Sequence, residues 1–210
     1  MKYSEKDIDL LRDLVGQRLS QKRFLHTIGV ESMAVKIGEK CLPESIDLLR
    51  IAALLHDISK EYSEAEHFEL LKKHNITISE YELSSPALWH SITAPLVVAD
   101  DFPEFADRQV LSATRRHTVG SPDMGVLEEI ILLADYIEEG RRYEACIDLR
   151  EKFLAELCMA DDRSEAVLAL HRAVAASLDN TINELMARGR LPHESSALTR
   201  DAVLAKLERH

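Results

Sequence analysis

A run of five apolar residues, Ile51-Ala52-Ala53-Leu54-Leu55, ends directly at a histidine and an aspartate, His56 and Asp57. Pro43-Glu44 opens the helix that we predict to contain this run. Five consecutive apolar residues leave such a helix no polar face to turn toward water, so the helix must be buried on most of its sides. An imidazole and a carboxylate at the end of a buried helix cost free energy unless a partner compensates them.

The composition favours helices over the rest of the chain as well. Apolar residues make up 46% and aromatic residues 5% of the 210 residues, with only 7 Gly and 6 Pro. Leu, Ala and Ile dominate, a balance typical of helices and not of sheets. We therefore expect an all-α fold in a single domain, 1–210, because no linker divides the chain. A core at about 20–140 would hold the site, and helices from about 143 to 210 would complete the bundle.

Capping residues and prolines indicate where the helices begin. Ser4 with Asp7, and Ser63 with Glu66, fit capping boxes, whereas Ser85-Pro86 and Pro103-Glu104 place a proline in a first helical turn. Glycine and proline make 118–123 the clearest loop. The predicted helices start at Ser4, run over about 23–41, 43–55, 63–73, 86 onward, 103–117, 126–138, 143–157 and 162–188, and end with a short helix in the tail.

The charge of the chain limits its partners. With 26 Lys+Arg against 37 Asp+Glu, the formal net charge is −11 at pH 7. This argues against nucleic acid and anionic membranes as partners but leaves room for a small phosphorylated ligand in a locally basic cleft. The three cysteines are far apart, and neither a signal segment nor an apolar stretch of membrane-spanning length is evident. We therefore expect a cytoplasmic protein.

Further polar residues also interrupt apolar helical faces or lie at helix ends. The full set is His26, His56, Asp57, His90, His117 and Asp135. Helices that converge in a bundle can bring such residues into one shell. Imidazoles combined with carboxylates suit Fe, Mn, Ni, Co or Zn better than Ca or Mg. The other histidines, His67, His74, His171, His193 and His210, we interpret as exposed or incidental.

The order of these residues resembles the H…HD…D signature of the HD superfamily of metal-dependent phosphohydrolases, at His26, His56-Asp57 and Asp135. Longer strings are similar to the YqeK-type symmetrical bis(5′-nucleosyl)-tetraphosphatases. They are KRFLHTIGV, ALLHDISKEY, WHSITAP, RRHTVGSPDM, LLADYIEEGRRYE and the tail TINELMARGRLPHESSALTRDAVLAKL. The resemblance therefore covers nearly the whole chain.

This resemblance implies a fold, a cofactor and a reaction. The fold would be a helical HD-domain bundle, and the cofactor would be iron, as one or two ions, with Mn, Co or Ni as alternatives. The substrate would be diadenosine tetraphosphate or a close relative, cleaved symmetrically to two molecules of ADP by attack of metal-bound hydroxide on phosphorus. A homodimer would be the oligomeric state.

The resemblance also assigns roles by position. The metal ligands would be His26, His56, Asp57 and Asp135. The catalytic residues would be Asp57, Lys60, His90 and His117. Substrate contacts would come from Gly29, His90, His117, Thr118, Asp135 and Arg141. His90 and His117 could instead bind a second metal ion, and the sequence leaves that choice open.

The residues themselves leave further alternatives. Lys60, Arg141 and either Arg116 or Arg142 could bind phosphate oxygens, and arginine suits bidentate contact. Of each pair, Arg115-Arg116 and Arg141-Arg142, we expect one member to be functional and the other to be ordinary surface. Gly29 either makes room for a ligand or allows close helix packing. Pro95 should kink the helix that contains His90 and shift that histidine.

Two other functions compete with the tetraphosphatase. One is an HD phosphohydrolase that acts on a nucleoside monophosphate or a cyclic nucleotide. The other is a non-catalytic HD module that senses nucleotides.

Overall fold

The computed structural model describes residues 2–209, which form α-helices and short 3-10 helices and contain no strand. The α-helices are α1 (Glu5–Arg18), α2 (Gln21–Cys41), α3 (Ile46–Leu55), α4 (Glu64–Lys73), α5 (Glu80–Leu83), α6 (Trp89–Asp101), α7 (Arg108–Arg116), α8 (Val126–Ile137), α9 (Glu144–Met159), α10 (Arg163–Ala187) and α11 (Glu194–Leu207). The 3-10 helices are η1 (Pro43–Ser45), η2 (Pro86–Leu88) and η3 (Pro103–Phe105). The all-α expectation is confirmed.

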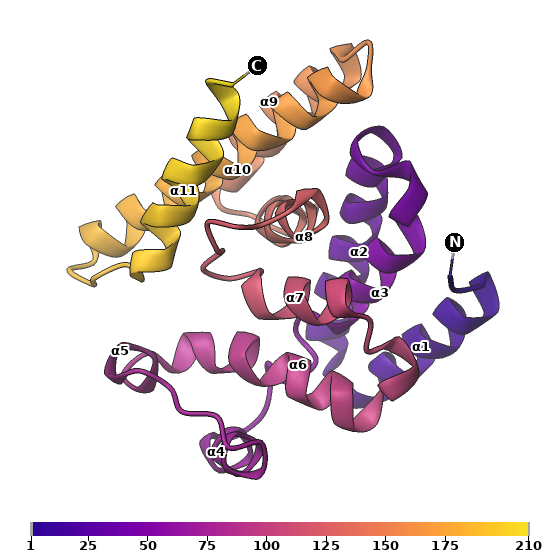
Figure 1. The fold of residues 1–210 in the computed structure, drawn as a ribbon, viewed down its shortest axis with the longest axis vertical. Helices are drawn as coiled ribbons and strands as arrows, with labels where there is room; N and C mark the ends of the chain where they lie inside the picture. The colour runs from indigo at the N-terminus through magenta and orange to yellow at the C-terminus, as the bar shows by residue number, and fades with distance from the viewer. Residues whose placement is uncertain (1, 210) are drawn as a thin grey trace.

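Helix α8 lies at the centre of the fold and is seen nearly end-on in Figure 1, with α2, α3, α7 and α10 packed around it. The apolar run of α3, Ile51–Leu55, is fully buried, as its lack of a polar face predicts. Ile130, Ile131 and Leu133 of α8 are buried to the same extent. Two such helices, each apolar around most of its circumference, form the centre of the core.

The C-terminal helices cover one side of α8. Helices α10 and α11 lie side by side, and α9 packs along α10 (Figure 1). A buried carboxylate links them: Glu129 of α8 accepts hydrogen bonds from His171 of α10 and from the ammonium group of Lys206 of α11. Glu129 is 0% exposed, so these two partners compensate a charge that water does not reach.

Capping boxes locate helix starts well in this chain. Ser4 with Asp7 and Ser63 with Glu66 form the predicted boxes. Ser79 forms another with Glu82 and starts α5, a short helix that the sequence interpretation did not include.

Prolines locate helix starts less well. The prediction that an α-helix opens at Pro103 is wrong, because Pro103 starts only a 3-10 turn. Helix α7 begins after Asp107, whose carboxylate accepts from the backbone N–H of Gln109. Pro43 and Pro86 likewise start 3-10 turns that lead into α3 and α6. A fixed proline φ suits either kind of turn, so proline alone does not select the α-helix.

Helix α6 runs unbroken through Pro95 from Trp89 to Asp101. The backbone hydrogen bond that the proline removes would end at the carbonyl of Ser91, the residue after His90, so His90 keeps its place in the first turn. None of the helices within 2–209 is both long and apolar enough to cross a membrane.

Candidate metal centre and adjoining cleft

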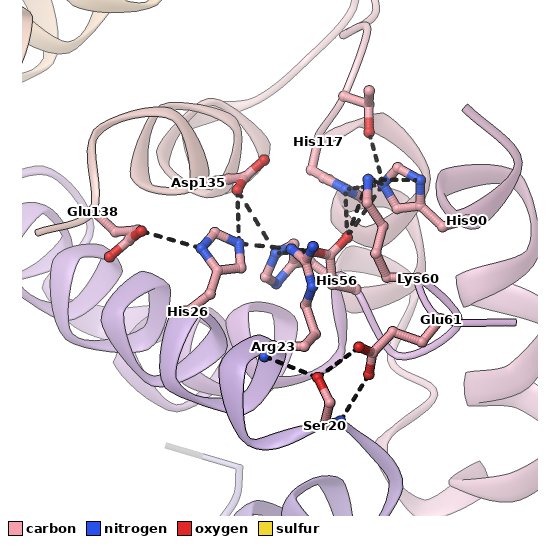
Figure 2. Close-up of polar contacts among 12 residues, drawn as sticks. Ser20, Arg23, His26, His56, Lys60, Glu61, His90, His117, Asp135 and Glu138 are labelled. Carbon is pink, nitrogen blue, oxygen red and sulfur yellow. Dashed lines mark hydrogen bonds and ion pairs between the residues drawn. The ribbon is translucent and has the colours of Figure 1, made fainter. Parts of the chain in front are cut away.

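The predicted polar residues come from helices far apart in sequence and meet at the end of α3 (Figure 2). They are His26 on α2, His56 and Asp57 directly after α3, His90 in the first turn of α6, His117 directly after α7, and Asp135 in the last turn of α8. The ligand atoms of His26, His56 and Asp57 lie within 4.8 Å of one another, and so do those of two further overlapping groups. The expected convergence into one cluster is therefore present.

Asp57 lies in the middle of this cluster, and its two carboxylate oxygens face different neighbours. Oδ2 lies 3.4 Å from His56 Nε2 and 3.7 Å from His26 Nε2. Oδ1 lies 3.2 Å from His90 Nε2 and 3.6 Å from His117 Nε2. The carboxylate thus divides the cluster into a His26 side and a His90 side.

The backbone fixes the tautomer of two of these histidines. His56 Nδ1 donates to the carbonyl of Ala53 at 2.7 Å, and His117 Nδ1 donates to the carbonyl of Thr114 at 2.9 Å. A carbonyl oxygen can only accept, so the proton of each neutral ring is on Nδ1. The lone pair of each Nε2 therefore points into the cluster, which is the arrangement of metal-binding histidines.

Buried atoms without partners test whether a metal ion fits here. His26 Nε2, His56 Nε2 and Asp57 Oδ1 are buried and form no well-oriented hydrogen bond. His26 Nε2 lies 3.0 Å from Asp135 Oδ1, close enough for both to bind one ion. Buried polar atoms without a hydrogen-bond partner cost free energy. A divalent metal ion held by nitrogen and carboxylate oxygen would compensate all of them, so the donor set fits such an ion.

The electrostatics of the cluster keep both aspartates ionised. Burial alone would raise the pKa of Asp57, but the imidazoles around it, His56 first and then His117 and His90, lower it well below its usual value. Burial would also raise the pKa of Asp135, but the nearby His26 ring and the positive charge of Arg141 lower that pKa well below its usual value. Two ionised carboxylates therefore stand ready for a cation.

The His90 side carries nitrogen donors and a hydroxyl. Lys60 Nζ lies within 3.1 Å of both ring nitrogens of His90, and His90 Nε2 lies 3.0 Å from His117 Nε2. The Thr118 hydroxyl is 3.3 Å from His90 Nε2. Burial lowers the pKa of Lys60 and lowers that of His90 well below its usual value. Pro95 has not removed His90 from the cluster.

The loop after α7 is held in place by the C-terminal helix. Gly120 has a φ of +73°, and a Cβ there would lie 2.7 Å from Thr199 of α11. The Ser196 hydroxyl donates to the carbonyl of Val119. A glycine therefore allows α11 to approach the loop that positions His117 and Thr118.

Two residues of the His26 side were missed by the sequence interpretation. Arg23 Nη1 donates to Asp57 Oδ2 at 2.7 Å. Glu138 Oε1 lies 3.2 Å from His26 Nδ1 and orients that ring from behind. Their spacing in the sequence could have indicated both residues. Arg23 precedes His26 by about one helical turn, and Glu138 follows Asp135 by the same interval, so each pair lies on one helix face.

Gly29 leaves space on α2 for the carboxylate of Glu138. A Cβ at Gly29 would lie 2.5 Å from Glu138 Oε2. Of the two interpretations of Gly29, close packing is the one that this contact supports. Gly29 also lines a cleft, however, so a ligand can still approach its backbone.

A cleft of about 1200 Å³ opens beside His26, between α2 and the segment that follows α8. Arg141 lines it and also donates to the carboxylate and the carbonyl of Asp135. Arg142 lines it too, whereas Arg115 and Arg116 pair with acidic side chains elsewhere. The arginine pair at 141–142 is therefore the one that faces a ligand-sized space.

The remaining histidines have other roles. His67 and His171 are buried and hydrogen-bonded outside the cluster, so of the two expected alternatives they are incidental and not exposed. His74 pairs with Asp100, and His193 caps α11. His210 lies outside the described residues.

The match to the HD domain family covers residues 23–158, and the chain belongs to that family. Similar proteins named "Bis(5'-nucleosyl)-tetraphosphatase, symmetrical" occur in Bacillus subtilis, at 29% identity over 88% of this chain and 91% of the relative, and in Halalkalibacterium halodurans, at 29% over 91% and 94%. The crystal structure of a predicted HD superfamily hydrolase involved in NAD metabolism from Clostridium acetobutylicum is also similar. It has a TM-score of 0.79 and 27% identity, covering 97% of this chain and 98% of that one. The family resemblance inferred from the sequence is confirmed.

Proposed function

We propose that this protein is a metal-dependent hydrolase that cleaves diadenosine tetraphosphate, or a related dinucleoside polyphosphate, symmetrically to two molecules of ADP. One observation carries the proposal: buried, unpartnered ligand atoms at His26, His56 and Asp57 lie directly beside a basic cleft. The names of the relatives from Bacillus subtilis and Halalkalibacterium halodurans support the substrate and the symmetrical outcome.

His26, His56, Asp57 and Asp135 are the residues that would hold the metal ion. Iron is our proposal for its identity, with Mn, Co or Ni as alternatives, because all of these accept mixed imidazole and carboxylate ligands. A bound ion of this kind lowers the pKa of water and supplies hydroxide near neutral pH.

The side chains around this centre bind and orient the polyphosphate. Arg141 and Lys60 supply positive charge to opposite parts of the chain of phosphates. Neutralising those charges is a large part of the catalysis of phosphoryl transfer. Thr118 offers a hydroxyl to a phosphate oxygen, and Gly29 lets the ligand approach the backbone of α2. We infer that either His90 or His117, in its protonated form, would give a proton to the departing phosphate.

We infer that His90 and His117 bind phosphate and not a second metal ion, although their ligand atoms and those of Asp57 lie within 4.8 Å of one another. The Lys60 ammonium group lies within 3.1 Å of both His90 ring nitrogens, where it would repel a cation. The same ammonium group attracts an anion. We therefore assign His90, His117 and Lys60 to the phosphate.

We also propose a single domain over the chain. One buried apolar cluster that includes residues from α1 to α11 supports it. The cytoplasmic location and the homodimer stay predictions.

The test is product analysis on protein purified without oxygen, with its metal content measured by mass spectrometry. Incubation with diadenosine tetraphosphate should give ADP as the sole nucleotide product. AMP plus ATP would contradict symmetrical cleavage. Release of nucleoside and phosphate from AMP, with the dinucleotide untouched, would identify the alternative phosphohydrolase. Tight nucleotide binding without turnover by the fully loaded protein would identify the sensor.

A further inference from the structure

The cleft beside His26 extends well beyond the metal ligands. Its inner end is lined by Arg23, His26 and Arg141, and its outer part by residues of α2 and of the segment after α8. At about 1200 Å³, it exceeds the roughly 300–1000 Å³ that is usual for small-molecule pockets. Such a space can hold more than a pair of phosphate groups.

The outer part of the cleft carries basic side chains. Arg23 and Arg141 at the inner end are paired with Asp57 and Asp135. Lys22 and Arg142 farther out are exposed, and neither forms an ion pair within residues 2–209. Glu138 and Glu139 also line the cleft, so its lining carries four basic and two acidic side chains. In a chain of net charge −11, this is a local excess of positive charge.

Two large apolar side chains also face the cleft, one from each wall. Leu25 on α2 is 64% exposed, and Tyr143, just before α9, is 68% exposed. Exposed apolar side chains are ordinary when scattered singly, but these two line the same cavity. A tyrosine face and a leucine side chain are surfaces on which a nucleobase packs.

We propose that this outer part of the cleft binds the nucleoside of one half of the substrate, with its base against Tyr143 and Leu25. Lys22 and Arg142 would contact the diphosphate of the same half. This inference rests on the proposed function.

The symmetry of the reaction requires two such subsites. Cleavage at the central anhydride of a dinucleoside tetraphosphate leaves a nucleoside diphosphate on each side of the reacting phosphorus. Lys60, His90 and Thr118 lie on the Oδ1 side of Asp57. His26 lies at the opposite end of the cluster from His90 (Figure 2), and the cleft opens beside His26. The nucleoside in the cleft is therefore the one distal to His90.

Photolabelling with 2-azido-ADP locates this nucleoside without any turnover. Trypsin should release two cleft peptides, one over 24–36 with Leu25 and one over 143–150 with Tyr143. We expect label on both peptides in metal-loaded protein, suppressed by excess ADP. Tyr143→Ala should reduce the label on the 24–36 peptide about tenfold, given roughly 1–3 kcal/mol for each stacked base. Label absent from both peptides, or insensitive to ADP, would overturn the inference.

Kinetics give a second measurement. Leu25→Ser and Tyr143→Ala should each raise KM for diadenosine tetraphosphate about tenfold, with a smaller change in kcat, because stacking acts on ground state and transition state alike. Leu10→Ser is the matched control, since Leu10 is 55% exposed on α1 and lies outside the cleft lining. Its KM should equal that of the unaltered protein. An unchanged KM in both cleft variants would also overturn the inference.

The two proposals fail separately. Labelled cleft peptides in a protein that does not cleave the dinucleotide would remove the proposed function and keep the nucleoside subsite. Symmetrical cleavage with unlabelled cleft peptides would do the reverse.

Discussion

The two sides of Asp57 differ in the charged groups that surround their histidines. On the His26 side, Asp135 and Glu138 add carboxylates around an imidazole, and both lie within 3.2 Å of its ring nitrogens. On the His90 side, the neighbours of the imidazole besides Asp57 are the His117 ring, the Lys60 ammonium group and the Thr118 hydroxyl. Arg23 and Arg141 add positive charge to the first set as well. We propose that the carboxylates of the first set hold the metal ion, that the second set binds phosphate, and that Asp57 lies between the two.

The substitution with the largest expected effect is Asp57→Ala, because it removes the group that both sides share. Metal content should fall, and hydrolysis of diadenosine tetraphosphate should fall by on the order of 1000-fold, as when a main stabilising group is lost. Mass spectrometry of the metal and chromatography of ADP measure the two losses. Circular dichroism should show the helical content retained, and undiminished activity would refute the metal centre.

Removing one histidine from each side tests the comparison directly. His26→Ala should lose bound metal. His90→Ala should keep it and slow turnover by about 10²–10⁴-fold, the usual contribution of a group that transfers a proton. Metal analysis of the two purified variants, side by side, distinguishes these outcomes. If His90→Ala lost a full metal equivalent, His90 would be a ligand of a second ion.

Replacing the carboxylate of Glu138, which contacts His26 Nδ1, should have a smaller effect on metal binding. Glu138→Gln weakens the hydrogen bond that orients the ring, and loss of such an outer partner lowers metal affinity about 10–100-fold. Competition with a chelator measures the affinity. The neighbouring exposed residue provides the control, because Glu139→Gln should leave the affinity unchanged. Equal affinities in the two variants would mean that Glu138 does not support the metal site.

The smallest expected effect is on stability and comes from His67, which lies at the end of a chain of hydrogen bonds to the backbone of His90. His67 contacts the Thr93 hydroxyl, which in turn contacts Ser59, and Ser59 donates to the backbone carbonyl of His90. Burial lowers the pKa of His67 in the folded protein, so below the ordinary histidine pKa of about 6.5 the unfolded chain binds more protons. The free energy of unfolding therefore falls as pH drops through that value toward the folded pKa.

His67→Gln removes this titration. Its thermal midpoint should decline less between pH 7.5 and 5.5 than that of the unaltered protein. Scanning calorimetry at several pH values is the measurement, and parallel declines would contradict the assignment.

The sequence predicted the helices whose signals are local. The apolar run before His56 and the serine–carboxylate boxes identify elements by contacts within one turn. The start of α7 was wrong, because Pro103 suits a 3-10 turn as well as an α-helix, and Asp107 sets the actual start.

The cluster itself was predictable because each of its members interrupts an apolar segment or ends a helix. The separation of the cluster into a His26 side and a His90 side was not predictable. That separation depends on which oxygen of Asp57 faces which histidine. The packing of α2, α6 and α7 against one another determines this. Arg23 and Glu138 were missed for a related reason: charged residues near helix ends are usually solvated, and only the fold turns these two inward.

The contact between Gly29 and Glu138 has a consequence for how chains of this kind diverge. Position 29 cannot take a larger residue while Glu138 stays in place, since a Cβ at 29 would lie 2.5 Å from the carboxylate oxygen of Glu138. Related chains with a larger residue at the first position should carry a shorter one at the second, and should orient their first histidine by other means. The two sites would then be inherited as a pair, although more than a hundred residues separate them along the chain.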